Sequence, residues 1–385
     1  MTARPEHRAA AGEHDTHPEA LEMPENHFDQ VVVTGSVDES RRASLRTRIV
    51  AVVIMPLFFI VTFSLCYLSA LHDPKPHDMA LTIAGPSATT EQVARALDDR
   101  APGGFDVTRT TDPGSARKAV EDRTAVGAVL IDGDRVTTVV AGGGGRTAAV
   151  AVEQVGDRVA TELGGTATVT DVAPLTKGDV SGTVLFFFVV ACTVGAFMTL
   201  TVVAQAMPRA RTRTAVGVGA LASLLIPVIS FAVISIFVGD YGRSFGEIAA
   251  AIGVGMVYTF AVAMLSLLFN MFLKNAAIFG QILFLIALNF PSGGGSSPAS
   301  MLPAFWQFVH SGWFGSGAFE AIRSIVYFDG AQAGRWLLQV AIWAAAAPIV
   351  VVIAAIGRAR RRPEDEEAAP AVAQDGGAVL AGAGV

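Results

Sequence analysis

Charge is scarce in this sequence, and lysine is the scarcest charged residue. Asp, Glu, Lys and Arg make up 16% of the 385 residues, against about 25% in an average soluble protein, whereas 52% are apolar. None of the four lysines follows a glycine, so the nucleotide-binding pattern G-x-x-x-x-G-K-[ST] is absent. A nucleophile elbow and the zinc motif H-E-x-x-H are missing as well. We therefore expect a protein that is not an enzyme and has no cofactor.

Cysteine and net positive charge are also lacking. Cys66 and Cys192 both lie inside apolar runs, which leaves no disulfide framework and no zinc site. The net charge of −6 argues against a nucleic-acid partner. The histidines of the first 40 residues fit no metal-ligand spacing. We expect disordered tails over 1–48, where the last residues are basic, and over 357–385.

Long apolar runs, in contrast, are abundant. A run over 49–71 has no charge, and 48 residues precede it, which indicates a retained membrane anchor and not a signal peptide. Four later runs also reach the ~20 residues that a helix needs to cross hydrocarbon. One further run, over 276–290, is shorter and could instead be re-entrant or buried. The later runs cover 183–207, 215–238, 248–272, 276–290 and 336–356.

Lysine and arginine are distributed unevenly between the two sides that these runs define. Twelve lie in short segments assigned to one side, whereas only Arg243, Arg323 and Arg335 lie in those of the other. This asymmetry predicts that both termini are cytoplasmic, which requires an even number of spans. The short run must then cross. We predict a polytopic α-helical protein of the cytoplasmic membrane with six transmembrane helices, the last five within 183–356.

The polar segment over 72–182 is long enough for one small domain. "MALTIAG", "VGAVLIDG", "DRVTTVVAG" and "TATVTDV" are typical of strands, and three segments between them have helical spacing. Thr89 or Thr90 and Ser115 are the expected helix N-caps. Strands that alternate with helices predict an extracytoplasmic α/β domain with a mixed sheet, inserted between the first and second transmembrane helices.

Three features of this domain could suggest chemistry, but each has a simpler interpretation. Asp132 and Asp134 fit a hairpin turn around Gly133 better than a metal site. "AGGGGR" over 141–146 lacks the Lys-Ser/Thr of a phosphate loop and favours a flexible loop. "HDPKPHD" over 72–78 carries two histidines that could bind a metal, yet its prolines indicate a stiff linker.

Residues 291–330 are too apolar for a free loop and too rich in Gly and Pro for a span. We expect a glycine-rich turn, a hydrophobic hairpin at the outer interface, and an amphipathic helix over 318–328. Irregular backbone at that depth requires cover by protein or by a water-filled cavity, so the segment is either a vestibule or gate, or a packed plug. The candidate pathway or gate residues are Asn289, Pro291, Gly293, Gly294, Gly295, Glu320 and Arg323.

Several of these motifs together resemble a known family. "NFPSGGG" with "SMLPAFWQF", "GAFEAIRSIVYFDG", "CYLSALHDPKPHD" and "DVAPLTKGDVSG" are similar to segments of the ABC-2 type permease superfamily, in its branch allied to YhgE/Pip (phage-infection protein) and DUF3533 membrane proteins. The resemblance covers roughly residues 49–356. One departure is "TVLFFFVVACTVGAF" over 183–197, where the family leads us to expect a tyrosine and more small polar residues.

The resemblance implies the permease subunit of an exporter. Such subunits form homodimers or heterodimers, and a separate ATP-binding cassette ATPase drives the movement of a hydrophobic or lipid-like substrate. The cytoplasmic loop with Arg209, Arg211 and Arg213 is the candidate contact for that ATPase, although these residues could equally be topology determinants alone. The basic segment before the first span would lie on membrane lipid. The alternative is a non-transporting surface scaffold or receptor, of the phage-infection or secretion-accessory kind.

Overall fold

The computed structural model describes residues 36–207 and 209–367. The chain divides into two units between residues 53 and 54. The described part of the first unit is the beginning of helix α1 (Ser36–Leu71). The rest of α1 and all the elements described below belong to the second unit. The expected tail over 1–48 lies largely, and the tail over 357–385 partly, outside the described residues.

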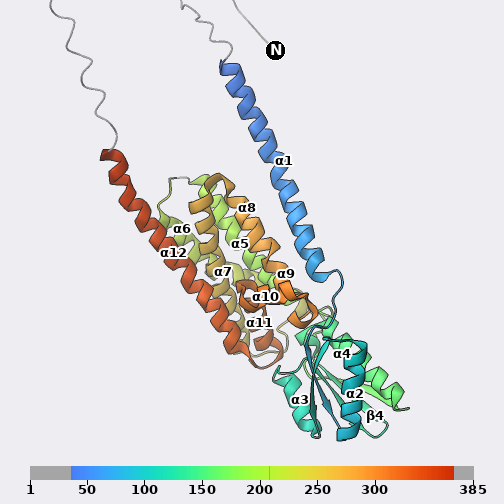
Figure 1. Cartoon of the computed structure of the whole chain (residues 1–385). Helices are drawn as coiled ribbons and strands as arrows, with labels where there is room; N and C mark the ends of the chain where they lie inside the picture. Colours follow the sequence, from blue (N-terminus) through green and yellow to red (C-terminus); the bar gives the residue numbers. More distant parts are fainter. Residues whose placement is uncertain (1–35, 208, 368–385) are drawn as a thin grey trace, which may run out of the picture. The chain divides into compact units, whose positions relative to one another are not determined.

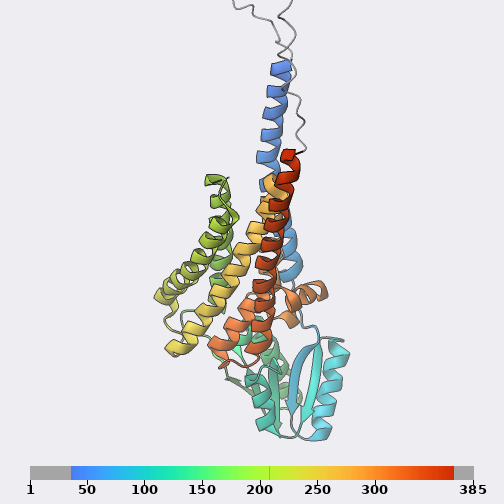
Figure 2. The ribbon, with the colours of Figure 1, turned by 90° about the vertical axis from the view of Figure 1, so that its left-hand side faces the viewer.

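Within the described residues, five helices are long and apolar enough to cross a membrane. They are α1, α5 (Val184–Ala206), α6 (Thr212–Val238), α7 (Phe245–Leu273) and α12 (Ala333–Glu367), whose apolar part ends at Arg358. Helices α5, α6 and α7 pack against one another, and α12 packs on α7 (Figures 1 and 2). Large apolar side chains such as Ile229, Ile236 and Ile353 stay exposed along these helices, as lipid contact requires. These features identify a polytopic helical membrane protein.

The predicted short run over 276–290 corresponds to a shorter apolar helical segment, Ala277–Gly293. It consists of α8 (Ala277–Gln281), a π-helical turn (Ile282–Ala287) and α9 (Asn289–Gly293), and a 3₁₀ turn (Lys274–Ala276) joins it to α7. After a glycine turn and a second 3₁₀ turn (Ala299–Met301), the chain forms α10 (Ala304–Gly312) and α11 (Phe314–Tyr327) before α12.

The α/β domain contains a mixed five-stranded sheet with the strand order β2-β1-β3-β4-β5. All neighbouring strands are parallel except β3 and β4, which form an antiparallel hairpin. Its turn contains Gly133 at φ +63°, which confirms the predicted hairpin. The strands are β1 (Met79–Ala84), β2 (Phe105–Thr110), β3 (Gly127–Asp132), β4 (Arg135–Val140) and β5 (Thr166–Asp171).

Three helices connect these strands. They are α2 (Ser87–Arg100), α3 (Pro113–Glu121) and α4 (Arg146–Glu162). Because parallel crossovers are right-handed, α2 and α4 lie on one face of the sheet and α3 on the other, as Figure 1 shows. Met79, Ile83 and Val152 belong to the apolar core between the sheet and the α2–α4 face.

Three local predictions for this domain are wrong. Strand β2 was not among the expected strands. Asp112, and not Ser115, caps α3 through its side chain, and the N-cap of α2 is Pro86, whose side chain makes no capping bond. Residues Gly142–Gly144 form a 3₁₀ turn packed under α11 and are not a flexible loop. Any Cβ at Gly143 would overlap the Tyr327 ring, so this close approach requires glycine.

Candidate functional site

Helix α11 is buried along its entire length, from Phe314 to Tyr327. It packs against α5, α7, α9, α10 and α12, and the 3₁₀ turn of the α/β domain covers it from another side. The sequence predicted an amphipathic helix over 318–328. The helix begins four residues earlier, and its polar residues are buried like its apolar ones. Glu320 and Arg323, which suggested a polar face, are each only 2% exposed.

Glu320 lies between two arginines. Its Oε1 accepts a hydrogen bond of 2.6 Å from Nη1 of Arg323, and its Oε2 pairs with Nη2 of Arg123. Arg123 belongs to the turn between α3 and β3, and its Nη1 also donates to Ser324 Oγ at 2.5 Å. Nη2 of Arg323 donates to the carbonyl oxygen of Gly295 at 2.7 Å. This ion cluster therefore joins the α/β domain, α11 and the glycine turn after α9.

The guanidinium groups of both arginines lie over aromatic rings, and the backbone of Arg123 is strained. The Arg123 guanidinium lies 4.9 Å from the Phe328 ring centroid, and that of Arg323 lies 4.2 Å from Phe319. Arg123 has φ +59°, a left-handed conformation that costs a non-glycine residue about 1 kcal/mol. The buried ion pair holds this unfavourable backbone in place.

The two guanidinium groups keep Glu320 ionised. Burial alone raises the pKa of this carboxyl, but the positive charges of Arg323 and Arg123 outweigh burial and hold its pKa well below its usual range. His310 of α10 is also buried, and burial lowers its pKa. Its Nδ1 lies 2.7 Å from the carbonyl oxygen of Ser292, which can only accept, so Nδ1 carries the proton.

A cavity of about 740 Å³ adjoins the ion cluster. Arg123 and Glu320 line it from one side, and Trp336 and Trp343 of α12 line it from another. Arg335 also lines it, stacks on Trp336 at 4.0 Å, and has no carboxylate partner among the described residues. With one carboxylate against two arginines on its wall, the cavity has a positive surplus beside aromatic surface. Such a wall suits an anionic amphipathic molecule.

Asn289 belongs to a different polar group, inside the helical bundle. Its Nδ2 donates to Tyr258 Oη of α7 at 2.8 Å, and that hydroxyl lies 2.5 Å from Thr193 Oγ1 of α5. Oδ1 of Asn289 is buried and has no hydrogen-bond partner among the described residues. One polar chain thus links α5, α7 and α9.

A second polar group links α5, α7 and α8. Gln281 Nε2 donates to Ser266 Oγ at 2.9 Å and to Asn270 Oδ1 at 3.4 Å, while its Oε1 accepts from Thr201 at 3.4 Å. The helices that pack here are therefore tied by amide and hydroxyl groups and not by charges. Such bonds stabilise helix association in lipid by about 1 kcal/mol each.

The structure separates the predicted gate residues into two sets. Gly295, Glu320 and Arg323 meet in the ion cluster, whereas Asn289 lies with Tyr258 in the bundle. The residues between them are Pro291, Gly293 and Gly294, which form the buried end of α9 and its turn. Gly294 has φ +72°, and a Cβ there would overlap the Ser297 carbonyl, so the turn requires glycine.

The three predicted partner-contact arginines lie elsewhere. Arg209, Arg211 and Arg213 are exposed around the connection between α5 and α6 and make no ion pair with any carboxylate of the described chain. Helix α5 starts beside the α/β domain at Val184 and rises about 34 Å over its 23 residues. The three arginines are therefore at the end of the bundle that is farther from the ion cluster.

Sequence reasoning missed four residues of these sites: Arg123, Tyr258, His310 and Arg335. Arg123 contacts a helix 197 residues later in the chain, and no local pattern marks such a pair. Among the described residues no group of three or more His, Cys, Asp or Glu side chains could hold a metal ion. His72 and His77 each contact a nearby backbone carbonyl instead.

Comparisons with protein-family models, with curated proteins and with solved structures yield no match to this chain.

Proposed function

We propose that this protein is the permease subunit of an ABC-2 type exporter. A separate ATP-binding cassette ATPase hydrolyses ATP, and the permease moves a hydrophobic or lipid-like substrate across the cytoplasmic membrane. The observation that carries the proposal is the cavity beside the ion cluster. It lies where α10, α11, α12 and the inserted α/β domain meet, and its arginines and tryptophans match a molecule with an anionic head and an apolar body.

The distribution of cations supports an orientation with cytoplasmic termini. Arg209, Arg211 and Arg213 share one end of the bundle with Lys274 after α7 and with Arg358 near the end of α12. Nη2 of Arg358 donates to the carbonyl of Met271, which places the ends of α7 and α12 together. This cation-rich end is the cytoplasmic one. The α/β domain at the opposite end is then extracytoplasmic.

The short apolar segment 277–293 completes six spans in this proposal. It starts beside Lys274 at the cation-rich end and finishes at the turn whose Gly295 carbonyl accepts from Arg323 in the ion cluster. Its residues rise about 25 Å, slightly less than the ~30 Å hydrocarbon core. Local thinning of the bilayer compensates for a mismatch of this size.

In this proposal, ATP-driven movement at the cytoplasmic end reaches the cavity through the bundle. Helices α7 and α12 contact each other, and α12 extends from the cation-rich end to the cavity that it lines. Helix α11 packs on both, and its Glu320 holds the α/β domain through Arg123. A shift of α12 against α7 would therefore change the wall formed by Trp336 and Trp343. Two copies of the permease, in a homodimer or heterodimer, would enclose the pathway.

The test is purification of the chain with and without any P-loop ATPase that is encoded beside its gene. The proposal expects association and a faster ATP turnover in the complex than for the ATPase alone. No association together with unchanged turnover would overturn the proposal.

One observation favours the alternative function, a non-transporting scaffold or receptor. The ion cluster and Gly143 fix the α/β domain firmly to α11, as a receptor that presents a rigid surface would require. A gene neighbourhood without a P-loop ATPase but with cell-wall or secretion genes would support this alternative.

A further inference from the structure

We propose that the groove between α2 and α4 of the α/β domain binds a single-chain anionic amphiphile, such as a fatty acid, with its head at Arg158 and its chain running toward Met301. The groove has a volume of about 690 Å³, within the range of small-molecule sites. It is a different site from the cavity beside the ion cluster, and binding to it does not rest on the proposed transport function.

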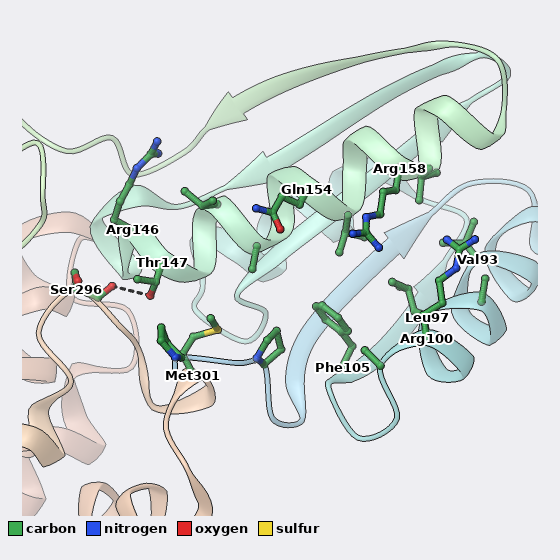
Figure 3. Close-up of a pocket in the computed structure, with 18 of the residues that line it drawn as sticks. Val93, Leu97, Arg100, Phe105, Arg146, Thr147, Gln154, Arg158, Ser296 and Met301 are labelled. Atoms are coloured by element: carbon green, nitrogen blue, oxygen red, sulfur yellow. Dashed lines mark hydrogen bonds between the residues drawn. The ribbon is translucent and has the colours of Figure 1, made fainter. Parts of the chain in front are cut away.

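The groove exists because α2 and α4 cover opposite halves of the same sheet face. Helix α2 packs on β2, and α4 packs mainly on β4. At one end an ion pair of 2.5 Å between Arg100 and Glu162 connects the two helices. The linker prolines after α1 also line the groove. Toward the other end the groove reaches the segment that contains Ser296 and Met301, as Figure 3 shows.

The floor of the groove is apolar over a length that fits an acyl chain. Phe105 and Leu97 line it from the β2–α2 side, and Val155 and Val159 line it from α4. Lining residues recur along α4 from Arg146 to Glu162, a rise of about 24 Å. An acyl chain of a bilayer covers half of the ~30 Å hydrocarbon core, about 15 Å, which leaves room for a head group.

The open end carries exposed apolar surface beside the polar side chains of Arg146, Thr147 and Ser296. Val180, which lines this end, is 74% exposed, and Met301, which also lines the groove, is buried. The linker to α1 and the segment that leads into α5 both border this end, so the groove opens toward the membrane-spanning helices. An amphiphile that leaves the bilayer head-first would reach Arg158 with its head while its chain covered Val180 and Met301.

Charge selects an anionic head. Arg158 lines the groove and, within the described chain, pairs with no carboxylate, unlike Arg100 with Glu162 and Arg146 with Glu153. Figure 3 shows Arg158 on the wall of α4, across the groove from Leu97 and Arg100. A carboxylate or phosphate at this point would gain charge-assisted hydrogen bonds from a free guanidinium.

The experiment uses the purified full-length chain in nanodiscs of phosphatidylcholine and, as probe, palmitate with a diazirine at its ω end. Irradiation followed by mass spectrometry maps the labelled residues, and competition measures affinity. We expect adducts at Met301 or Val180, and we expect unlabelled palmitate to compete at least tenfold better than methyl palmitate, which has no charge. Labelling confined to the cavity lined by His310 and Trp336, or equal competition by the two, would overturn the proposal.

Matched variants separate the groove from non-specific lipid contact. Arg158→Gln should weaken competition by palmitate about tenfold, which corresponds to about 1.4 kcal/mol. Arg117→Gln, on the opposite face of the sheet, should leave it unchanged.

Ala151→Trp fills the groove and should abolish labelling, whereas Ala88→Trp on the outer surface of α2 should not. Labelling that survives Ala151→Trp, or equal effects of the two arginine variants, contradicts the proposal. Arg158 is exposed, so its replacement leaves the fold intact.

Discussion

Replacement of Glu320 by Gln is the substitution whose effect follows most directly from the ion cluster. Gln keeps the shape of the side chain but removes the carboxylate that forms ion pairs with both Arg323 and Arg123. The Arg323 side chain is 2% exposed and that of Arg123 is 15% exposed, so water cannot replace the lost charge. Removal of one partner from a buried ion pair costs about 3–5 kcal/mol, and we expect a loss of free energy of unfolding in that range.

The assay is reversible unfolding in mixed micelles, followed by tryptophan fluorescence. Trp336 and Trp343 line the cavity beside the cluster, so the signal reports on this part of the protein. Glu153→Gln is the matched control, because Glu153 pairs with Arg146 at 3.5 Å on the surface and should contribute about 0.5 kcal/mol or less. If Glu320→Gln destabilises the protein no more than Glu153→Gln does, the buried charge pairing is wrong.

The difference in stability between the native protein and Glu320→Gln depends on pH in a defined way. The pKa of Glu320 is lowered on folding, so its ionisation stabilises the folded state at every pH above the unfolded-state pKa of about 4.3. That contribution is lost only as the pH falls toward the folded-state pKa. The stability difference between the native protein and Glu320→Gln should therefore stay constant from pH 7 to pH 5 and shrink below pH ~4. A difference that shrinks between pH 7 and pH 5 would contradict the assigned pairing.

Three further outcomes are expected. Tyr258→Phe leaves the Nδ2 group of Asn289 without its acceptor and should lower the free energy of unfolding by about 1–3 kcal/mol; equal stability would show that the bond is absent. Gly143→Val places side-chain atoms on the Tyr327 ring and should make the α/β domain more sensitive to limited proteolysis; unchanged digestion would refute the close packing. A cysteine at Asp132 should react with a membrane-impermeant maleimide in intact cells; reaction only after lysis would reverse the orientation.

The sequence predicts the long apolar helices well and the polar edge strand β2 poorly, for a physical reason. Uninterrupted apolar runs define α5 and α6 almost alone, so their predicted bounds agree with the structure to within three residues. The edge strand β2, "FDVTRT", mixes exposed polar residues with two half-buried apolar ones and has no apolar run. It was missed because its pairing with β1 and its packing against α2 are tertiary contacts, which no local run of residues marks.

For the site, local sequence could place Glu320 and Arg323 on one helix face but not in the interior. Charges three residues apart usually mark a solvated face. Here, Arg123 from another domain and the Gly295 carbonyl compensate their burial, and both contacts depend on tertiary structure. The same limit applies to Tyr258. In the sequence it is an ordinary core aromatic, and its polar role depends on Asn289, which the fold places beside its hydroxyl.

ATP turnover of any P-loop ATPase that is encoded beside the gene, with and without this chain, tests the permease proposal most directly. The native chain should associate with the ATPase and raise its turnover. The triple variant Arg209→Gln, Arg211→Gln and Arg213→Gln should lose most of that stimulation, whereas a matched Arg95→Gln and Arg117→Gln variant of the α/β domain should retain it. An ATPase whose turnover is the same alone, with the native chain and with both variants would contradict the proposed function.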